Sequence, residues 1–296
     1  MNKKYSLFQI FISLFFLNAV LSCTKKPSEF NSNNALHTIN KQIELGPRIP
    51  GSESSKDFSK IVHRELANTK WKIENQEFNY RGTNLTNIII KNPSDHLSFI
   101  ISTHYDTRRF SDREKSVEKR SIPVPGANDG ASGTAILIEL AKSLEPDQYP
   151  GLGFVLFDAE DQGEINGWDW SVGSAFFVDN LKNIPEQVII IDMVGDKDLQ
   201  IYMEQNSDPW INHSLWKIAD ELGYSDTFIN EYGYSMMDDH SPFLLSQIPA
   251  ALLIDFDYPY WHTNEDTVDK VSANSLEMVA GVLKKWLDDY VKSPNK

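Results

Sequence analysis

The stretch GFVLFDAED, residues 153–161, decides the fold class. Its first half is apolar without a break, as in a strand covered on both faces, and its second half is acidic. The same style recurs in four more β-branched or apolar runs, TNIIIKN (86–92), SFIIST (98–103), QVIIIDMV (187–194) and PAALLID (249–255). Each run is interpreted as a buried strand, and three of them, SFIIST, QVIIIDMV and PAALLID, also lead toward polar residues.

Helical patterns lie before and between these runs. They are ALHTINKQIELG (35–46), a capped amphipathic stretch from Ser52 to Leu66, SGTAILIELAKSL (132–144), SDPWINHSLWKIADELG (207–223) and SANSLEMVAGVLKKWLDDYV (272–291). Alternating strands and helices predict an α/β protein, a three-layer α/β/α domain. No repeat or linker interrupts the chain after about residue 35, so residues 35–292 are interpreted as one domain.

Composition excludes several classes of function. The 296 residues include 28 Lys and Arg, 42 Asp and Glu, and one cysteine. One cysteine rules out an internal disulfide framework and a Cys-rich zinc finger. The net charge of −14 leaves no basic footprint for nucleic acid and fits a cationic ligand.

The N-terminus predicts export. Lys3 and Lys4 precede the apolar run LFQIFISLFFLNAVL, which is short for a membrane span, and Ser22-Cys23 follows. Residues 1–22 are therefore interpreted as a signal peptide, and the sequence around Cys23 resembles the lipobox of bacterial lipoproteins. That resemblance implies a lipid anchor on Cys23, with residues 23–34 as a polar tether, in the bacterial cell envelope; an ordinary signal with a chance cysteine is the alternative.

Polar residues gather where the apolar runs end. His104 to Asp106, Asp158 to Asp161, Asp192 and Trp261-His262-Thr263 follow or end four of them, and Asp129 stands in GANDGASG (126–133), before a helix. Singly, each has an ordinary interpretation as a polar residue, a turn or a strand-end cap. Together they predict a metal site, because ligands collect at the carboxyl edge of such sheets and buried acids need a cation. The charge-dense stretch from Arg108 to Arg120 is interpreted as a solvated loop.

The ordered set HisTyrAsp, AsnAspGly, GluAsp, Asp and HisThr resembles the M28 metallopeptidases and their glutaminyl cyclase branch, over about residues 35–290. The resemblance implies a central mixed, mostly parallel sheet, as in zinc aminopeptidases. It also implies zinc on Asp129, Asp161 and His262, with Glu160 as general acid and base. Asp161 stands where many relatives have Glu.

Two branches of the family use the remaining residues differently. In aminopeptidases a second zinc is held at the positions of His104 and Asp192, and both residues are present. In cyclases the position of Asp192 binds no metal and pairs with an aspartate of an AspAspHis segment, here Asp238. Aminopeptidases more often have SerAspHis there, so this segment favours the cyclase branch.

The tryptophans add to the resemblance. Trp261 precedes His262 as in cyclases, and Trp168 and Trp170 stand in a Trp-rich loop like that of bacterial members. We expect Trp261, Trp170 and Trp168 to line the substrate pocket, with ordinary packing as the alternative for the last two. One feature departs from animal cyclases: they carry a histidine in the strand before the Trp-His pair, where this chain has Ala250 to Leu253.

The sequence therefore predicts a one-zinc glutaminyl cyclase, which would convert the N-terminal glutamine of peptides to pyroglutamate and release ammonia. Glu160, Asp192 and Asp238 would carry the proton path. The alternatives are a two-zinc M28 aminopeptidase and an inactive, lipid-anchored binding protein of the same fold.

Overall fold

The computed structural model describes residues 29–93 and 96–292. The predicted signal peptide and the predicted anchor residue Cys23 lie outside these residues. Within the described part of the chain, no helix is both long enough and apolar enough to cross a bilayer.

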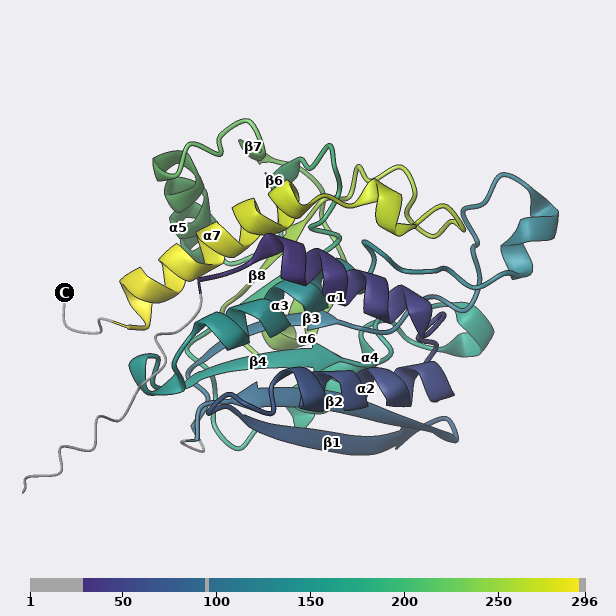
Figure 1. Cartoon of the computed structure of the whole chain (residues 1–296), viewed down its shortest axis with the longest axis horizontal. Coiled ribbons are helices and arrows are strands. Elements are labelled where there is room, and N and C mark those ends of the chain that lie inside the picture. Colours follow the sequence, from purple (N-terminus) through teal and green to yellow (C-terminus); the bar gives the residue numbers. More distant parts are fainter. Residues whose placement is uncertain (1–28, 94–95, 293–296) are drawn as a thin grey trace, which may run out of the picture.

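A six-stranded sheet forms the centre of the molecule (Figure 1). Its strands, in spatial order, are β1 (Lys72–Tyr80), β2 (Thr83–Lys91), β4 (Leu152–Phe157), β3 (Phe99–His104), β5 (Gln187–Asp192) and β8 (Ala250–Ile254). The last four are mutually parallel, whereas β1 and β2 form an antiparallel hairpin that pairs antiparallel with β4. The predicted mixed, mostly parallel sheet is confirmed.

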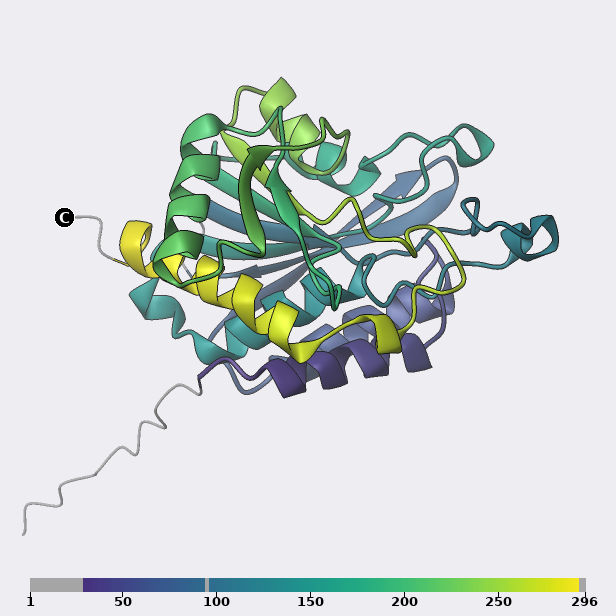
Figure 2. The same cartoon turned by 90° about the horizontal axis from the view of Figure 1, so that it is seen from above.

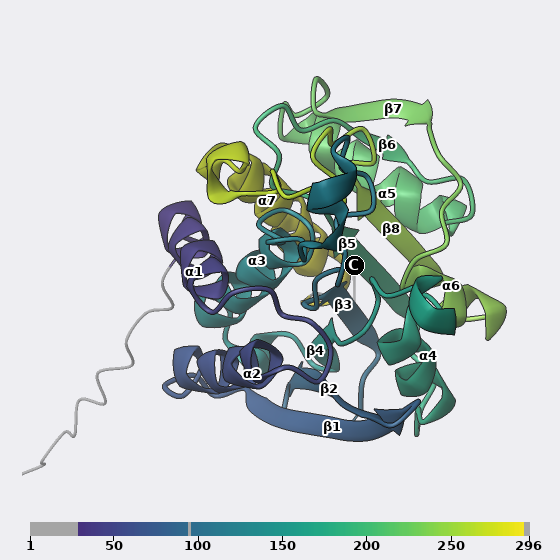
Figure 3. The same ribbon diagram turned by 90° about the vertical axis from the view of Figure 1, so that its right-hand side faces the viewer.

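Helices cover both faces of the sheet, which gives three layers (Figures 2 and 3). One face is covered by α1 (Ser32–Glu44), α2 (Glu53–Glu65), α3 (Ala131–Ser143) and α7 (Ala273–Tyr290). The opposite face is covered by α4 (Val172–Asp179) and α6 (His240–Leu245). Near the β8 edge, α5 (Pro209–Glu221) lies beside a small parallel sheet of β6 (Ile201–Met203) and β7 (Phe228–Tyr232). Short 3₁₀ turns complete the chain: η1 (Val117–Ser121), η2 (Pro146–Gln148), η3 (Ile165–Gly167) and η4 (Val268–Lys270).

Each predicted strand and helix is present, and local chemistry explains where several begin. The side chains of Asn31, Ser52, Asp208 and Ser272 accept backbone N–H groups at the starts of α1, α2, α5 and α7. Such caps satisfy donors that the first helical turn leaves unpaired. The cap at Asn31 starts α1 inside the range 23–34 that the sequence suggested as a tether, because the polar residues there include a good N-cap.

Five elements were not predicted from the sequence: β1, β6, β7, α4 and α6. Strand β1 has no buried residue because it is an edge strand, so it carries no apolar run to detect. The other four elements are three to eight residues long, too short for a clear period. Of these, α4 and α6 matter for function, because the loops around them reach the site.

Candidate metal centre

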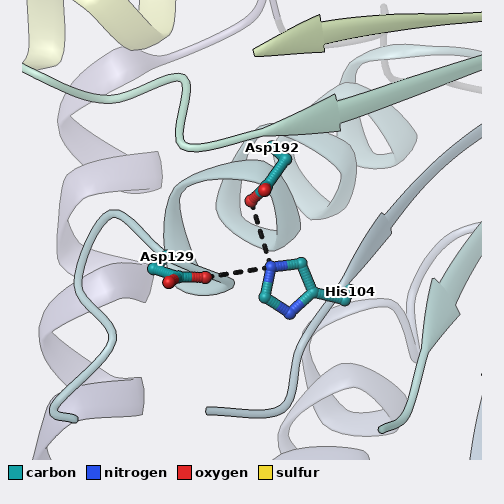
Figure 4. A group of neighbouring side chains, drawn as sticks. All are labelled: His104, Asp129 and Asp192. Atoms are coloured by element: carbon teal, nitrogen blue, oxygen red, sulfur yellow. Dashed lines mark hydrogen bonds and ion pairs between the residues drawn. The ribbon is translucent and has the colours of Figure 1, made fainter. Parts of the chain in front are cut away.

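Three strand-end and helix-start residues meet at the carboxyl edge of the sheet (Figure 4). His104 ends β3, Asp192 ends β5, and Asp129 stands just before Gly130, the residue that caps α3. The Nε2 atom of His104 lies 3.0 Å from Asp192 Oδ1 and 3.1 Å from Asp129 Oδ1. All three side chains are buried. The polar residues that end the parallel strands therefore lie together at this edge, as predicted.

A second group shares Asp129. The Nε2 atom of His262 lies 2.9 Å from Asp161 Oδ1 and 3.9 Å from the other oxygen of Asp129, Oδ2. In each group, one ligand atom from every residue lies within 4.8 Å of the others. Asp129 thus presents one oxygen to each group, and the predicted residues of both the first and the second metal site are brought together.

The second group fits a zinc ion. Asp129 Oδ2 and Asp161 Oδ2 are buried and accept no hydrogen bond. A buried carboxylate oxygen without a partner is costly, and a cation beside both oxygens would remove that cost. Carboxylate oxygen and imidazole nitrogen are both zinc ligands, and three protein ligands leave a fourth position open for substrate, as in catalytic zinc sites.

Two further aspartates hold the backbone that carries the ligands. Asp106 accepts the backbone N–H groups of Glu160 at 2.9 Å and of Asp161 at 3.3 Å. Asp266 accepts the N–H groups of Asn128 at 2.8 Å and of Asp129 at 3.1 Å. Both carboxylates are fully buried. They fix the turns on which the ligands stand, in the way outer-shell partners position metal ligands.

Strained backbone marks the same edge. Ala159, Met193 and His262 have φ angles of 59°, 48° and 56°, in the left-handed region that residues with a side chain seldom adopt. Each stands at a ligand or next to Asp192 or Glu160. Backbone strain of this kind persists only where surrounding contacts enforce it, and it concentrates at functional sites.

The charge-dense stretch that follows β3 is more than a solvated loop. Arg108 is buried, and its guanidinium donates to Asp161 Oδ1 at 3.4 Å and to Asp112 Oδ2 at 2.7 Å. The other oxygen of Asp112 lies 3.0 Å from Nδ1 of His262. This carboxylate–imidazole contact orients the ring so that Nε2 faces Asp161. This role could not be seen in the sequence, because Asp112 stands among many other charged residues.

The ligands border a cavity of about 150 Å³. Its lining includes Glu160, Asp192 and Asp238, which are the three residues predicted to move protons, and the rings of Trp170 and Trp261. The Trp261 and His262 rings lie 4.0 Å apart, and the Trp170 ring stacks on His262 at 6.3 Å. The two indole rings therefore line the cavity on the side of His262.

The two tryptophans of the Trp-rich loop go to different places. Trp170 packs against Gly163, where an added Cβ would lie 2.0 Å from the indole. Trp168 is absent from the cavity lining, and its ring instead packs edge-on against Tyr80 at 5.2 Å. The loop that joins β4 to these two tryptophans has positive φ angles at Glu164 and Asn166. This irregular path could not be predicted from the sequence. The structure thus separates Trp168 from the other predicted pocket residues.

The three acids of the cavity that are predicted to move protons have raised pKa values. Burial raises the pKa of Glu160 well above its ordinary value, and the nearby charge of Asp238 raises it further. Burial and then the charge of Asp192 raise the pKa of Asp238 to about 7. Burial also raises the pKa of Asp192, against the opposing effect of His104. Buried acids that repel one another hold protons near neutral pH, which suits proton transfer.

Comparison with known proteins agrees with this geometry. The chain is 29% identical to aminopeptidase YwaD of Bacillus subtilis over 92% of its own length, and it spans 60% of the length of that relative. It is 23% identical to glutaminyl-peptide cyclotransferase of Dictyostelium discoideum, over 95% of this chain and 91% of that protein. The structure matches Porphyromonas gingivalis glutaminyl cyclase with a TM-score of 0.82 and 28% identity, over 88% of this chain and 99% of that one.

These likenesses come from both branches of one family. The sequence profile of Peptidase family M28 matches residues 87–287, a range that holds His104, Asp129, Glu160, Asp161 and every later residue of the site. With that match over most of the chain, and with its three-layer fold and ligand set, the protein belongs to Peptidase family M28.

Proposed function

We propose that this protein cyclises the N-terminal glutamine of peptides to pyroglutamate and releases ammonia. The observation that carries the proposal is the cavity, in which Glu160, Asp192 and Asp238 line a small volume walled by Trp170 and Trp261. Such a space accepts one small side chain beside a proton-carrying acid. The likeness to the Dictyostelium discoideum and Porphyromonas gingivalis proteins supports the same reaction.

The first step is attack by the substrate's own amine on the side-chain carboxamide carbon. Glu160 takes one proton from that amine as the new C–N bond forms, and delivers it to the nitrogen that leaves as ammonia. Its raised pKa lets it hold the proton between the two events. Zinc held by Asp129, Asp161 and His262 would polarise the carboxamide oxygen and stabilise its developing charge.

Asp192 and Asp238 would tune this proton path. The charge of Asp192 raises the pKa of Asp238, and the charge of Asp238 raises the pKa of Glu160. Two adjacent carboxyls do not both ionise at low cost, so one of them keeps a proton near neutral pH. A protonated carboxyl there can donate a hydrogen bond to a carboxylate or to the substrate.

A two-zinc aminopeptidase is the second candidate. His104, Asp129 and Asp192 form a second group with ligand geometry, and the Bacillus subtilis relative is named an aminopeptidase. In this alternative Asp192 would hold an ion, and a water molecule would cleave the peptide bond. Asp238 favours the cyclase, because it lines the same cavity as Asp192 and lies near enough for the charge of Asp192 to raise its pKa.

One experiment separates the candidates. The purified domain is incubated with a dipeptide that begins with glutamine, and the products are identified by mass. Ammonia and a pyroglutamyl dipeptide support the cyclase, whereas free glutamine refutes it in favour of the peptidase. No product from any N-terminus indicates a binding protein. Zinc per chain is measured alongside, and we expect about one ion for the cyclase and about two for the peptidase.

We also propose that the protein is exported and held in the bacterial envelope by a lipid on Cys23. The support is the sequence alone: two lysines, a short apolar run and Ser22-Cys23. The test compares the native chain with Cys23→Ala in cells labelled with a fatty acid. Label and membrane association should both disappear in the variant. A native chain without label would refute the anchor.

A further inference from the structure

An apolar groove of about 600 Å³ adjoins the small cavity. It runs between α4 and α6, and Trp170, Met236 and Met237 line both the groove and the cavity. The two spaces therefore share a wall. A peptide whose first residue occupies the cavity can continue outward past this wall.

The chemistry of the groove is apolar. Its side walls are built mainly from Ala175, Val178, Met236, Met237, Leu244 and Leu245. Leu245 is 86% exposed and Met237 is 70% exposed, which is a large apolar exposure for a surface that meets only water. Methionines adapt to side chains of different shape, and they are common on surfaces that bind varied peptides.

Charge also limits what the groove accepts. Among the residues that line it, Asp179 alone is charged. No cation of the lining would neutralise an acidic ligand, and the chain as a whole carries a net charge of −14. An acidic side chain placed here would lose hydration and meet a like charge.

We propose that this groove binds the second and third residues of the peptide substrate and selects large apolar side chains there. The proposal rests on the proposed function, because it assumes that the cavity holds the N-terminal residue. An extended peptide advances about 3.3 Å per residue, so the second and third side chains reach beyond the cavity mouth into the groove. The occupant is thus a peptide with apolar residues after its first position, and acidic residues there are disfavoured.

The test uses three peptides that differ only at the second position: Gln-Phe-Ala amide, Gln-Gly-Ala amide and Gln-Glu-Ala amide. We expect kcat/KM for the phenylalanine peptide to exceed that for the glycine peptide about tenfold, with the glutamate peptide poorest. Leu245→Ser should reduce the phenylalanine-to-glycine ratio to between one and three. Its side chain is so exposed that the substitution leaves the fold intact.

Ile184→Ser is the matched control. Ile184 is 74% exposed and is not part of the groove lining, so the same change in polarity should leave the ratio near ten. A native ratio near one overturns the proposal. So does a ratio that Leu245→Ser and Ile184→Ser alter equally.

Direct binding separates failure of the groove from failure of the cyclase. The same peptides are titrated by calorimetry against Glu160→Gln, which should bind them without turnover. Tighter binding of the phenylalanine peptide, by about tenfold, supports the groove even if the native protein cyclises nothing, in which case the proposed function alone falls. Equal affinities overturn the groove even if cyclisation is observed.

Discussion

The carboxylate of Asp266 should decide how well the proposed zinc ligand Asp129 is held. It is fully buried and accepts three hydrogen bonds, from the N–H groups of Asn128 and Asp129 and from the hydroxyl of Tyr258 at 2.7 Å. Asp266→Ala would leave two buried N–H groups without an acceptor. Each such group costs about 1–3 kcal/mol, so we expect the variant to lose about 2–6 kcal/mol of unfolding free energy.

A matched control exists at the end of β8. Asp255 is also buried and also accepts two backbone N–H groups, from Gln200 and Asp257, both at 3.2 Å. Burial raises the pKa of both aspartates to about 7, so removing either relieves a similar charge penalty. Asp255→Ala should therefore also destabilise the protein, by less than Asp266→Ala because its two N–H donors are only partly buried, and neither donor belongs to a proposed zinc ligand.

The assays are urea unfolding of metal-free protein and competition for zinc with a coloured chelator. Asp266→Ala should weaken zinc binding at least tenfold, the range seen for outer-shell partners, while Asp255→Ala leaves zinc affinity within twofold of the native value. Asp266→Asn keeps one acceptor oxygen and provides a milder variant if the alanine form does not fold. Equal zinc affinity in Asp266→Ala and Asp255→Ala would refute the reasoning.

Three more predictions concern single carboxylates. Asp112→Asn removes the charge behind His262 and should weaken zinc binding about tenfold in the chelator assay, whereas Asp57→Asn, a half-buried acid on α2 far from the site, should not. Glu160→Gln should abolish turnover yet keep zinc bound, and loss of zinc would show that the roles of the acidic pair are reversed. Glu65→Gln should cost about 1 kcal/mol at pH 7, because two lysines lower the pKa of Glu65 to about 2 against the opposing effect of its burial. That cost is present in full above the unfolded pKa of about 4.3 and is lost as the pH falls toward 2; urea unfolding at pH 7, 4 and 2 measures it, and a cost independent of pH would contradict the pairing.

The sheet could be predicted because its strands are buried on both faces. The apolar runs at Gly153, Val188 and Ala250 coincide with strands that have no exposed residue. β1 is as long as β2 but lies at the edge of the sheet. None of its side chains is buried there, so the strand needs no apolar run. An apolar run in the sequence therefore indicates that a strand is buried. An exposed strand such as β1 has no such run and is not detected.

The gathering of the candidate metal ligands could be predicted for a similar reason. Acids at the ends of apolar strands are expensive unless they are neutralised, and the family resemblance assigned which of them bind zinc. Asp112 and Asp266 do not follow apolar strands. Both stand in loops among other polar residues, so the sequence gives no sign of their roles. Their roles depend on partners about 150 and 137 positions away, such as His262 and Asp129, and only the folded chain brings those partners together.

The site and the groove differ in how they are built. The ligands stand on strand ends and turns that buried carboxylates hold through backbone N–H groups, so a small displacement there would cost several hydrogen bonds. The groove is built from methionine and leucine side chains on short elements, and exposed side chains such as Leu245 can change without breaking any of those bonds. The same zinc site could thus serve peptides of different sequence through changes in the groove alone. By contrast, in the proposed function the choice between cyclisation and peptide cleavage would depend on whether Asp192 acts beside Asp238 in the proton path or holds a second ion.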